Sequence, residues 1–385
     1  MAAILSLNFW LTVSLFAATW VWISRIFSTV RFRKNHPALE PTGPSGLGAA
    51  PPKISVIIPA RNEEKNIGHC LTYLFKNDYP NFEIVVVDDR SNDHTPHLLE
   101  NFSKLSPVPL RVVRIEKLPE GWTGKNYAMQ TGSKAATGDW FLFVDADTTH
   151  TPSSISTAIQ KALDSKIDLL TLTPETESVT FWEKTVQPLA IGSLAVWFDS
   201  TKLANGQFLL VSRRSYEAVG GNEVVRQKVV EDIELAKEVA RAGFCVRLLD
   251  GTKLYRTRMY TSLKEILTGW TRILTHLFEK NLFRILEKIA MFAVFSILPF
   301  AVLAVEAAFA LGGSPSFSQN LLILSFAVST LIVAVRFVGN RMLKTDPWYA
   351  FLHPLGSLVM VWILLICAGR ILSGRPSLWK GESYV

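Results

Sequence analysis

The sequence predicts an α/β domain with a mostly parallel sheet, and transmembrane helices on its N-terminal and C-terminal sides. Three observations support this: apolar strands alternate with helical patterns over residues 53–260, an uncharged run lies near the N-terminus, and further uncharged runs follow residue 288. The composition agrees, because only 19% of the 385 residues are charged, whereas soluble domains carry about 25%. This shortfall argues against a purely soluble protein, and the composition excludes a disordered chain.

Residues 1–30 are predicted to form an N-terminal transmembrane anchor. Ile4 to Ser24 contain no charge, and about 20 such residues cross a bilayer as a helix. Basic residues follow this run from Arg25 onward, whereas a secretory signal peptide carries them before it. Since cytoplasmic flanks are rich in Lys and Arg, the anchor should enter the cytoplasm at its C-terminal end. A linker rich in Pro and Gly is expected at residues 31–52.

The α/β domain is expected over residues 53–260. Strands are predicted at 54–59, 83–89 and 140–145, and helices at 66–76, 95–105 and 231–240. Strands that are apolar on both faces and alternate with helices are typical of a parallel sheet. Ligands bind such sheets beyond the carboxyl ends of the strands. The polar residues after each strand are therefore the candidates for a site.

Charged or polar side chains lie at the carboxyl end of each predicted strand or directly after it. They are Arg61, Asn62 and Glu63, then Asp88, Asp89, Arg90, Ser91 and Asp93, then Asp145 and Asp147. Carboxylates at the spacing of Asp145 and Asp147 offer the hard oxygen ligands that Mg²⁺ or Mn²⁺ prefers, and these ions also bind diphosphates. Turns contain the same spacing, but the second acidic strand end upstream favours a metal.

Two common phosphate-binding devices are excluded. A Walker A loop ending at Gly124-Lys125 would need glycine at Pro119 and a hydroxyl residue at Asn126, and no G-x-G-x-x-G follows the first strand. Lys125 remains either a point charge for a phosphate or a solvated loop lysine. The three cysteines are far apart, which argues against a disulfide scaffold or a zinc site.

Five short sequence motifs follow one another along the chain. They are Val56-Ile57-Ile58-Pro59-Ala60-Arg61-Asn62-Glu63, Val87-Asp88-Asp89-Arg90-Ser91-Asn92-Asp93-His94-Thr95, Gly124-Lys125-Asn126-Tyr127-Ala128, Asp145-Ala146-Asp147 and Glu231-Asp232. This order resembles the family 2 glycosyltransferases, whose GT-A fold has a Rossmann-like sheet, over residues 53–275. With its membrane segments the chain is most similar to the ceramide, carotenoid and hopanoid-associated lipid glycosyltransferases. Gly121-Trp122-Thr123 and Trp379-Lys380-Gly381 with Tyr384 resemble the last two groups.

The resemblance implies roles for individual residues. The nucleotide pocket would be lined by Pro59, Arg61, Glu63 and Asp89, and Asp88 would contact the base or ribose. Lys125 and Arg272 would approach the phosphates, and Asp145 and Asp147 would hold Mg²⁺ or Mn²⁺ on the sugar diphosphate. Asp232, beside Glu231, would be the general base. It also implies an inverting transfer of one hexose, from UDP-glucose, to a membrane lipid. An acidic first helical turn at Glu231 and Asp232 also suits the helix dipole without catalysis.

Other functions stay open at this point. Processive members of the family carry Gln-x-x-Arg-Trp, whereas this chain has Gly269-Trp270-Thr271-Arg272, which weakens a polysaccharide synthase. A non-catalytic nucleotide-binding membrane scaffold is the other alternative. The net charge of +7 fits the basic flanks of membrane helices, and no nucleic-acid partner is expected.

The C-terminal third is predicted to associate with the membrane. Residues 261–288 read as basic amphipathic helices, either at the membrane surface or packed on the catalytic domain. Transmembrane helices are expected within 289–372, and a basic tail at 373–385. The final apolar run, at 351–368, is either re-entrant, placed along the membrane surface, or a fourth span, which would place the basic tail outside. Glu306 either contacts a ligand or faces other helices. The expected location is the cell inner membrane, multi-pass, with the catalytic domain in the cytoplasm.

Overall fold

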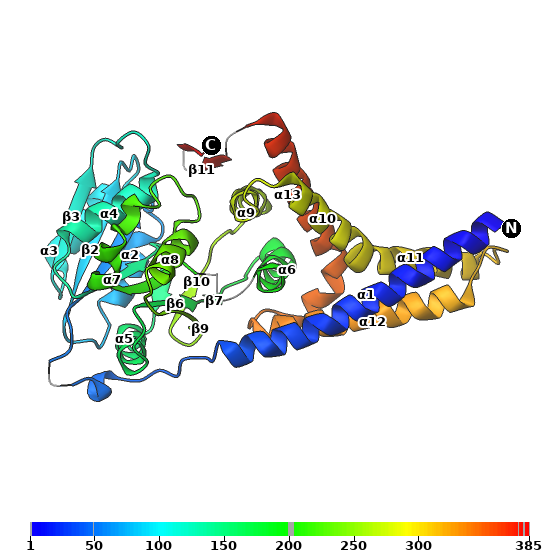
Figure 1. Ribbon diagram of the computed structural model, residues 1–385, viewed down its shortest axis with the longest axis horizontal. Coiled ribbons are helices and arrows are strands. Elements are labelled where there is room, and N and C mark those ends of the chain that lie inside the picture. The colour runs from blue at the N-terminus through cyan, green and yellow to red at the C-terminus, as the bar shows by residue number, and fades with distance from the viewer. Residues whose placement is uncertain (1, 49, 199–203, 376, 380–381, 385) are drawn as a thin grey trace.

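The computed structural model describes residues 2–48, 50–198, 204–375, 377–379 and 382–384. The sheet domain lies at one end of the molecule, and long apolar helices extend from it on the other side (Figure 1). Helices α6 and α9 lie between these two parts (Figure 1).

The larger sheet has seven strands among the described residues, in the order β3-β2-β1-β4-β8-β6-β9. The strands are β1 Ile54–Ala60, β2 Phe82–Asp89, β3 Leu110–Ile115, β4 Trp140–Val144, β6 Leu169–Thr173, β8 Phe208–Ser212 and β9 Val246–Asp250. Strand β8 is antiparallel to β4 and β6, and the other neighbours are parallel. The predicted mostly parallel sheet is confirmed.

Helices cover both faces of this sheet because its strands are apolar on both faces. Val56 and Ile58 belong to one core with α2 Ile67–Leu74, α3 Thr95–Leu105 and α5 Ser154–Asp164, while Ile57 belongs to a second core with α4 Gly124–Ala135 and α8 Glu231–Arg241. Successive side chains of a strand point to opposite faces. The short helix α7 Arg213–Ala218 follows β8.

A smaller sheet extends the carboxyl end of β4. Its strands are β5 Thr148–His150, β10 Tyr255–Thr257 and β7 Glu175–Thr176, in the order β5-β10-β7. Strand β5 begins directly after Asp147, and the Thr148 hydroxyl donates to the Asp145 carbonyl at 2.7 Å. The small sheet thus fixes the loop that carries Asp145 and Asp147.

Among the described residues, four helical segments are long and apolar enough to cross a membrane: Ser6–Asn35, Leu282–Leu311, Gln319–Met342 and Pro347–Ser373. The first lies within α1 Ala2–Asn35, and the others contain α10 Leu282–Phe292 with α11 Leu298–Leu311, α12 Gln319–Met342, and α13 His353–Ser373. A π-helical turn at Ala293–Ile297 joins α10 to α11. Transmembrane helices near both termini were predicted, and helices of that kind are present at both.

Several boundaries differ from the predictions. Helix α1 continues to Asn35, five residues into the expected linker, because Arg33 and Lys34 suit the negative end of a helix. Helix α10 begins at Leu282, inside the segment expected to be interfacial. The final run is one helix, α13, rather than a short re-entrant segment. Glu306 faces the other helices, where its Oε2 accepts from the Ser318 backbone N–H at 2.8 Å.

Helices α6 Phe181–Trp197 and α9 Leu263–Leu277 attach the long helices to the sheet domain. Trp270 of α9 donates to Gln187 of α6 at 2.8 Å. Gly356 of α13 lies so near the Thr185 carbonyl that an added Cβ would come within 2.8 Å of it. Trp270 of α9 also belongs to one buried core with Val186 of α6 and Met360 of α13. The apolar side of α9 therefore packs on α6, within the predicted catalytic domain, and on α13, within the predicted membrane region.

The tail forms a small hairpin of β11 Ser377–Trp379 and β12 Glu382–Tyr384. Lys380 and Gly381, which contribute to the predicted basic tail and to the resemblance, lie outside the described residues.

Candidate active site

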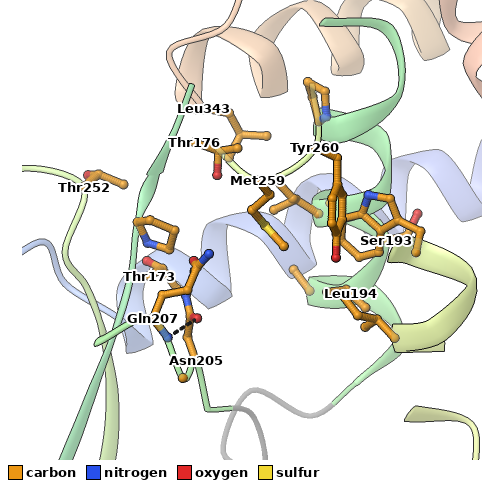
Figure 2. Close-up of a pocket in the computed structure, with 18 of the residues that line it drawn as sticks. Thr173, Thr176, Ser193, Leu194, Asn205, Gln207, Thr252, Met259, Tyr260 and Leu343 are labelled. Atoms are coloured by element: carbon orange, nitrogen blue, oxygen red, sulfur yellow. Dashed lines mark hydrogen bonds between the residues drawn. The ribbon is translucent and has the colours of Figure 1, made fainter. Parts of the chain in front are cut away.

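One cavity of about 1170 Å³ brings most of the predicted residues together. It opens at the carboxyl ends of the sheet strands and is bounded on the other side by α6 and α9. Figure 2 shows Asn205 and Gln207 on one side of this space and Tyr260 and Met259 on another. The predicted residues on its wall are Pro59, Arg61, Glu63, Asp89, Lys125, Asp145, Asp147, Glu231, Asp232 and Arg272.

Lys125 lies between two carboxylates of this wall. Its Nζ is 2.9 Å from Asp145 Oδ1 and 2.9 Å from Glu231 Oε1. Burial alone lowers the pKa of Lys125, but Asp145, Glu231 and Asp232 together raise it well above its usual range. Lys125 is therefore a fixed positive charge in the cavity, and not a solvated loop lysine.

Asp232 stands in the first turn of α8, next to Glu231. Its Oδ2 accepts from the Gly206 backbone N–H at 2.7 Å, and its Oδ1 accepts from the Ile233 N–H at 2.8 Å. Burial and the Glu231 charge raise the pKa of Asp232 to about 7, although Lys125 and the two backbone N–H groups oppose this shift. A carboxylate with a pKa near neutrality is suited to take and release protons.

Gly206 approaches Asp232 closely. A Cβ at this position would lie 3.3 Å from Asp232 Oδ2 and 3.4 Å from Lys125 Nζ. The same segment is anchored by Asn205, whose N–H donates to the Thr171 hydroxyl and whose side chain donates to the Tyr255 hydroxyl. The segment 204–207 therefore sets the position of Asp232.

The nucleotide side of the cavity lies at the ends of β1 and β2. The Asp89 carboxylate is bound by Arg90, with Nε at 2.7 Å, and lies 3.6 Å from Arg61 Nη1. The Glu63 N–H donates to the Thr95 hydroxyl at 2.8 Å. These contacts tie the β1–α2 loop to the β2–α3 loop, so Pro59, Arg61, Glu63 and Asp89 form one wall.

Asp88 is placed differently from its neighbours. Its side chain is buried, its Oδ1 accepts from the Ser91 N–H at 3.1 Å, and its Oδ2 is 3.7 Å from Arg114 Nε. It shapes the turn after β2 from behind the cavity wall, because alternate residues of a strand face opposite sides. A contact between Asp88 and the base or ribose stays a prediction. Since Asp88 lies behind the cavity wall, it would act on a nucleotide through the turn that it holds.

Arg272 reaches the cavity from α9 and lies against Tyr260. Burial raises the pKa of Tyr260, while its contact with Arg272 acts in the opposite direction. Asp145 and Asp147 line the same cavity as Arg272. The predicted approach of Arg272 to a bound diphosphate stays a prediction that this position supports.

The residues fit a divalent cation that binds together with a substrate. In the described part of the chain, no group of three or more His, Cys, Asp or Glu side chains has a metal-binding arrangement. Asp145 and Asp147 both line the cavity and supply only carboxylate oxygens. Mg²⁺ is commonly held by one or two carboxylates plus substrate phosphates, so two carboxylates are sufficient for that mode.

The Gly220-Gly221 turn is fixed in place. An added Cβ at Gly221 would lie 2.6 Å from the Tyr216 ring, and the Asn222 side chain donates to Asn126 at 3.0 Å. Asn126 in turn donates to the carbonyls of Val225 and Lys228, each at 2.9 Å. Asn126 therefore holds the segment that leads into Glu231 and Asp232.

The cavity does not end at the sheet domain. It continues along α6 to α1 and α12, where apolar side chains line it, and these are Trp22, Ile26, Val30, Leu331, Ala334, Val335 and Val338. Sequence reasoning missed this continuation, and it missed Gly206. Gly206 belongs to no sequence motif that could have singled it out, and the wall from α12 arises from packing between segments far apart in the chain.

The comparisons with known proteins agree with this geometry. The sequence model of Glycosyl transferase family 2 matches residues 55–233. Residues 55–233 are a family 2 glycosyltransferase domain. This domain contains the predicted residues from Pro59 to Asp232, so the predicted glycosyltransferase class is confirmed for this part of the chain.

Two similar proteins extend the comparison. A 4,4'-diaponeurosporenoate glycosyltransferase of Staphylococcus aureus is 27% identical over 234 residues, which are 58% of this chain and 60% of the relative's length. The mannosyltransferase PcManGT of Pyrobaculum calidifontis, solved with GDP-Man and Mn²⁺, has a TM-score of 0.55 and 18% identity, over 96% of this chain and 99% of that chain. The structural likeness confirms the GT-A-type fold around the family 2 domain.

Proposed function

We propose that the protein transfers one hexose from a nucleotide sugar, UDP-glucose first among the candidates, to a lipid acceptor in the membrane, with inversion at the anomeric carbon. The observation that carries the proposal is the single cavity whose wall includes Asp145, Asp147 and Asp232 at one end and α1 and α12 at the other. Such a passage lets a soluble donor and a membrane-embedded acceptor meet at the same carboxylates.

Asp232 is proposed as the general base. It takes the proton of the acceptor hydroxyl while the hydroxyl oxygen bonds to the anomeric carbon and the bond to the diphosphate oxygen breaks. The pKa of about 7 leaves much of Asp232 ionised at neutral pH, and a base of this kind contributes about 10²–10⁴-fold to the rate. One displacement step inverts the anomeric carbon, since retention by double displacement requires a second, nucleophilic carboxylate.

The departing diphosphate is proposed to bind beside Lys125. Asp145 and Asp147 would hold Mg²⁺ or Mn²⁺, which supplies Lewis-acid stabilisation of the leaving group when bound. Lys125 already pairs with Asp145 and Glu231 and can exchange these partners for phosphate oxygens. Arg272 approaches the same place from α9.

The acceptor is proposed to be a lipid because the far part of the cavity is apolar and is formed by helices suited to a membrane. The S. aureus relative is named for 4,4'-diaponeurosporenoate, a carotenoid carboxylate, which supports an acceptor with a long hydrocarbon chain. The basic ends of α1 and α12, with Arg33, Lys34 and Arg341, favour a cytoplasmic catalytic domain in a multi-pass inner-membrane protein.

Radiolabelled transfer tests the proposal. The purified full-length protein is incubated with Mn²⁺, a membrane lipid extract and, in separate reactions, labelled UDP-glucose, UDP-galactose, UDP-N-acetylglucosamine and GDP-mannose. Label should enter one lipid product, and Asp147→Asn and Asp232→Asn should abolish it, while Glu234→Gln in the same helix as Asp232 should not. A long polymer would favour the synthase, and the absence of any Asp232-dependent product would favour the scaffold.

A further inference from the structure

Two arginines line the membrane end of the cavity without acidic partners. Arg25 lies in α1 and Arg336 lies in α12, and both belong to segments suited to span a membrane. Arg336 is only 7% exposed, and its Nε and Nη2 have no hydrogen-bond partner, as is also true of Arg25 Nε. Within the described residues, neither guanidinium forms an ion pair with Asp or Glu.

The two guanidinium groups belong to helices that pack on each other. Trp22 of α1 and Ile332 of α12 are part of one buried core, and Arg25 and Arg336 follow them by about one helical turn, on the same faces of these helices. The Trp22 ring meets the His353 ring of α13 edge-on with 5.2 Å between centroids, and Arg25 Cζ lies 5.0 Å from the Trp22 centroid. We call Arg25, Arg336 and Trp22 the arginine cluster.

A guanidinium group in a membrane segment without an opposite charge beside it costs free energy. Charged side chains in membrane segments are rare, face the bundle interior or a cavity, and usually pair with an opposite charge. A guanidinium binds carboxylate or phosphate by paired N–H donors. The cluster therefore has the charge and the free donors for an anion, and the side chains beside it, such as Leu331 and Val335, suit a hydrocarbon chain.

We propose that the acceptor is an anionic amphiphile whose carboxylate or phosphate group binds to Arg336 and Arg25. Its hydrocarbon chain then lies between α1 and α12, and its hydroxyl end extends along the cavity toward Asp232. This inference rests on the proposed function, because it defines the acceptor class for that reaction. A phospholipid of the surrounding bilayer has the same chemistry, so the test separates these two sources.

The test measures the binding of paired probes to the full-length protein in phosphatidylcholine nanodiscs, without nucleotide sugar. The probes are oleate, oleyl phosphate and oleyl alcohol, which share one chain and differ in charge, with inorganic phosphate as a probe that lacks the chain. The wild type should bind oleate or oleyl phosphate about tenfold or more tightly than oleyl alcohol, as expected for a charge-assisted contact. Inorganic phosphate should bind far more weakly.

Arg336→Gln and, independently, Arg25→Gln should remove most of this preference, and Arg336→Lys should retain part of it. The matched control is Arg341→Gln, because Arg341 lies in the same helix but is exposed and away from the cavity wall. A structural role alone would change the thermal unfolding temperature without changing the ratio of anionic to neutral probe binding.

Three results would overturn the proposal. They are equal wild-type affinity for oleate, oleyl phosphate and oleyl alcohol, an unchanged preference in both glutamine variants, and binding of inorganic phosphate as tight as that of oleyl phosphate. Tighter binding of phosphatidic acid than of both oleate and oleyl phosphate, measured in the same nanodiscs, would assign the cluster to a bilayer lipid and would also overturn it. The binding test contains no nucleotide sugar, so its result does not depend on sugar transfer. A failure of the radiolabelled transfer test would count against the proposed function but not against the binding of an anionic amphiphile.

Discussion

The two ends of the cavity carry opposite charge, and they differ in how that charge is compensated. At the sheet end, Lys125 lies 2.9 Å from both Asp145 and Glu231, and backbone N–H groups bind Asp232. At the membrane end, Arg336 is buried with two nitrogens unbound. The sheet end is thus organised before any substrate arrives, whereas the membrane end is completed by a ligand.

This difference follows from what surrounds each end. The sheet end lies on strand ends and helix starts, where backbone N–H groups are available to carboxylates. The membrane end lies between helices whose backbone groups already bond within each helix, so only side chains or a ligand can compensate a charge there. The predictions below test whether the sheet end is organised as described, from the largest expected effect to the smallest.

Asp232→Asn should lower the rate of sugar transfer by about 10²–10⁴-fold, because an amide cannot accept the proton of the acceptor hydroxyl. Affinity for the nucleotide sugar, measured by calorimetry, should change little. Glu234→Gln is the control, since Glu234 pairs with Lys237 on the same helix. An Asp232→Asn variant that kept near wild-type turnover would assign the acidic turn to helix-dipole stabilisation alone.

Lys125→Met should lower kcat/KM by about tenfold to hundredfold, as expected for the loss of charge-assisted contacts. It should also shift the pH profile. In the wild type, kcat/KM should fall as pH drops below about 7, because Asp232 must be ionised to act as a base. Lys125 lowers the pKa of Asp232, so its loss should move this acidic limb to higher pH. If the acidic limb of the pH profile stayed at the same pH in Lys125→Met, the charge of Lys125 would not lower the pKa of Asp232.

Asn126→Ala should lower the free energy of unfolding by about 1–3 kcal/mol, because the carbonyls of Val225 and Lys228 lose the buried Asn126 side chain as their donor. The variant should also lose activity, since this segment leads into α8. Asn101→Ala is the control, because Asn101 is exposed and bonds only to His97 on its own helix. Equal thermal unfolding of the two variants would contradict the role given to Asn126.

Gly206→Ala should reduce kcat a few-fold, because its Cβ would lie 3.3 Å from Asp232 Oδ2 and would displace the carboxylate slightly. Gly369→Ala, where no atom lies within 4 Å of an added Cβ, should leave kcat unchanged. Steady-state kinetics on both variants measure the difference. If the two alanine variants behaved alike, the close approach of Gly206 would have no part in positioning Asp232.

Local sequence predicts much of the sheet end. The strands at 54–59, 83–89 and 140–145 correspond to β1, β2 and β4 within one residue at most ends, and the helix at 95–105 matches α3. Continuous apolar runs and flanking turn residues carry that information along the chain. The residues that follow these strands meet in one cavity, as parallel strands require.

The membrane end was not predictable in the same way. Arg25 was interpreted as a topology signal, because positive residues near helix ends usually have that role, and no binding role was predicted for Arg25 or Arg336. Their places on one cavity wall depend on how α1, α12 and α13 pack, which links positions about three hundred residues apart in the chain. The α9 pattern likewise could not distinguish a membrane surface from the α6 and α13 surfaces on which it packs.

The central claim is that a membrane-embedded acceptor reaches Asp232 through the passage beside α12. Gly339→Trp tests it most directly, because Gly339 lines the cavity and has open space in front of its Cα, and Gly369→Trp is the control in α13 outside the cavity. The measurement is the ratio of labelled sugar in lipid to labelled sugar released to water. The account predicts that Gly339→Trp lowers this ratio about tenfold or more relative to Gly369→Trp, and an equal ratio in the two variants would contradict it.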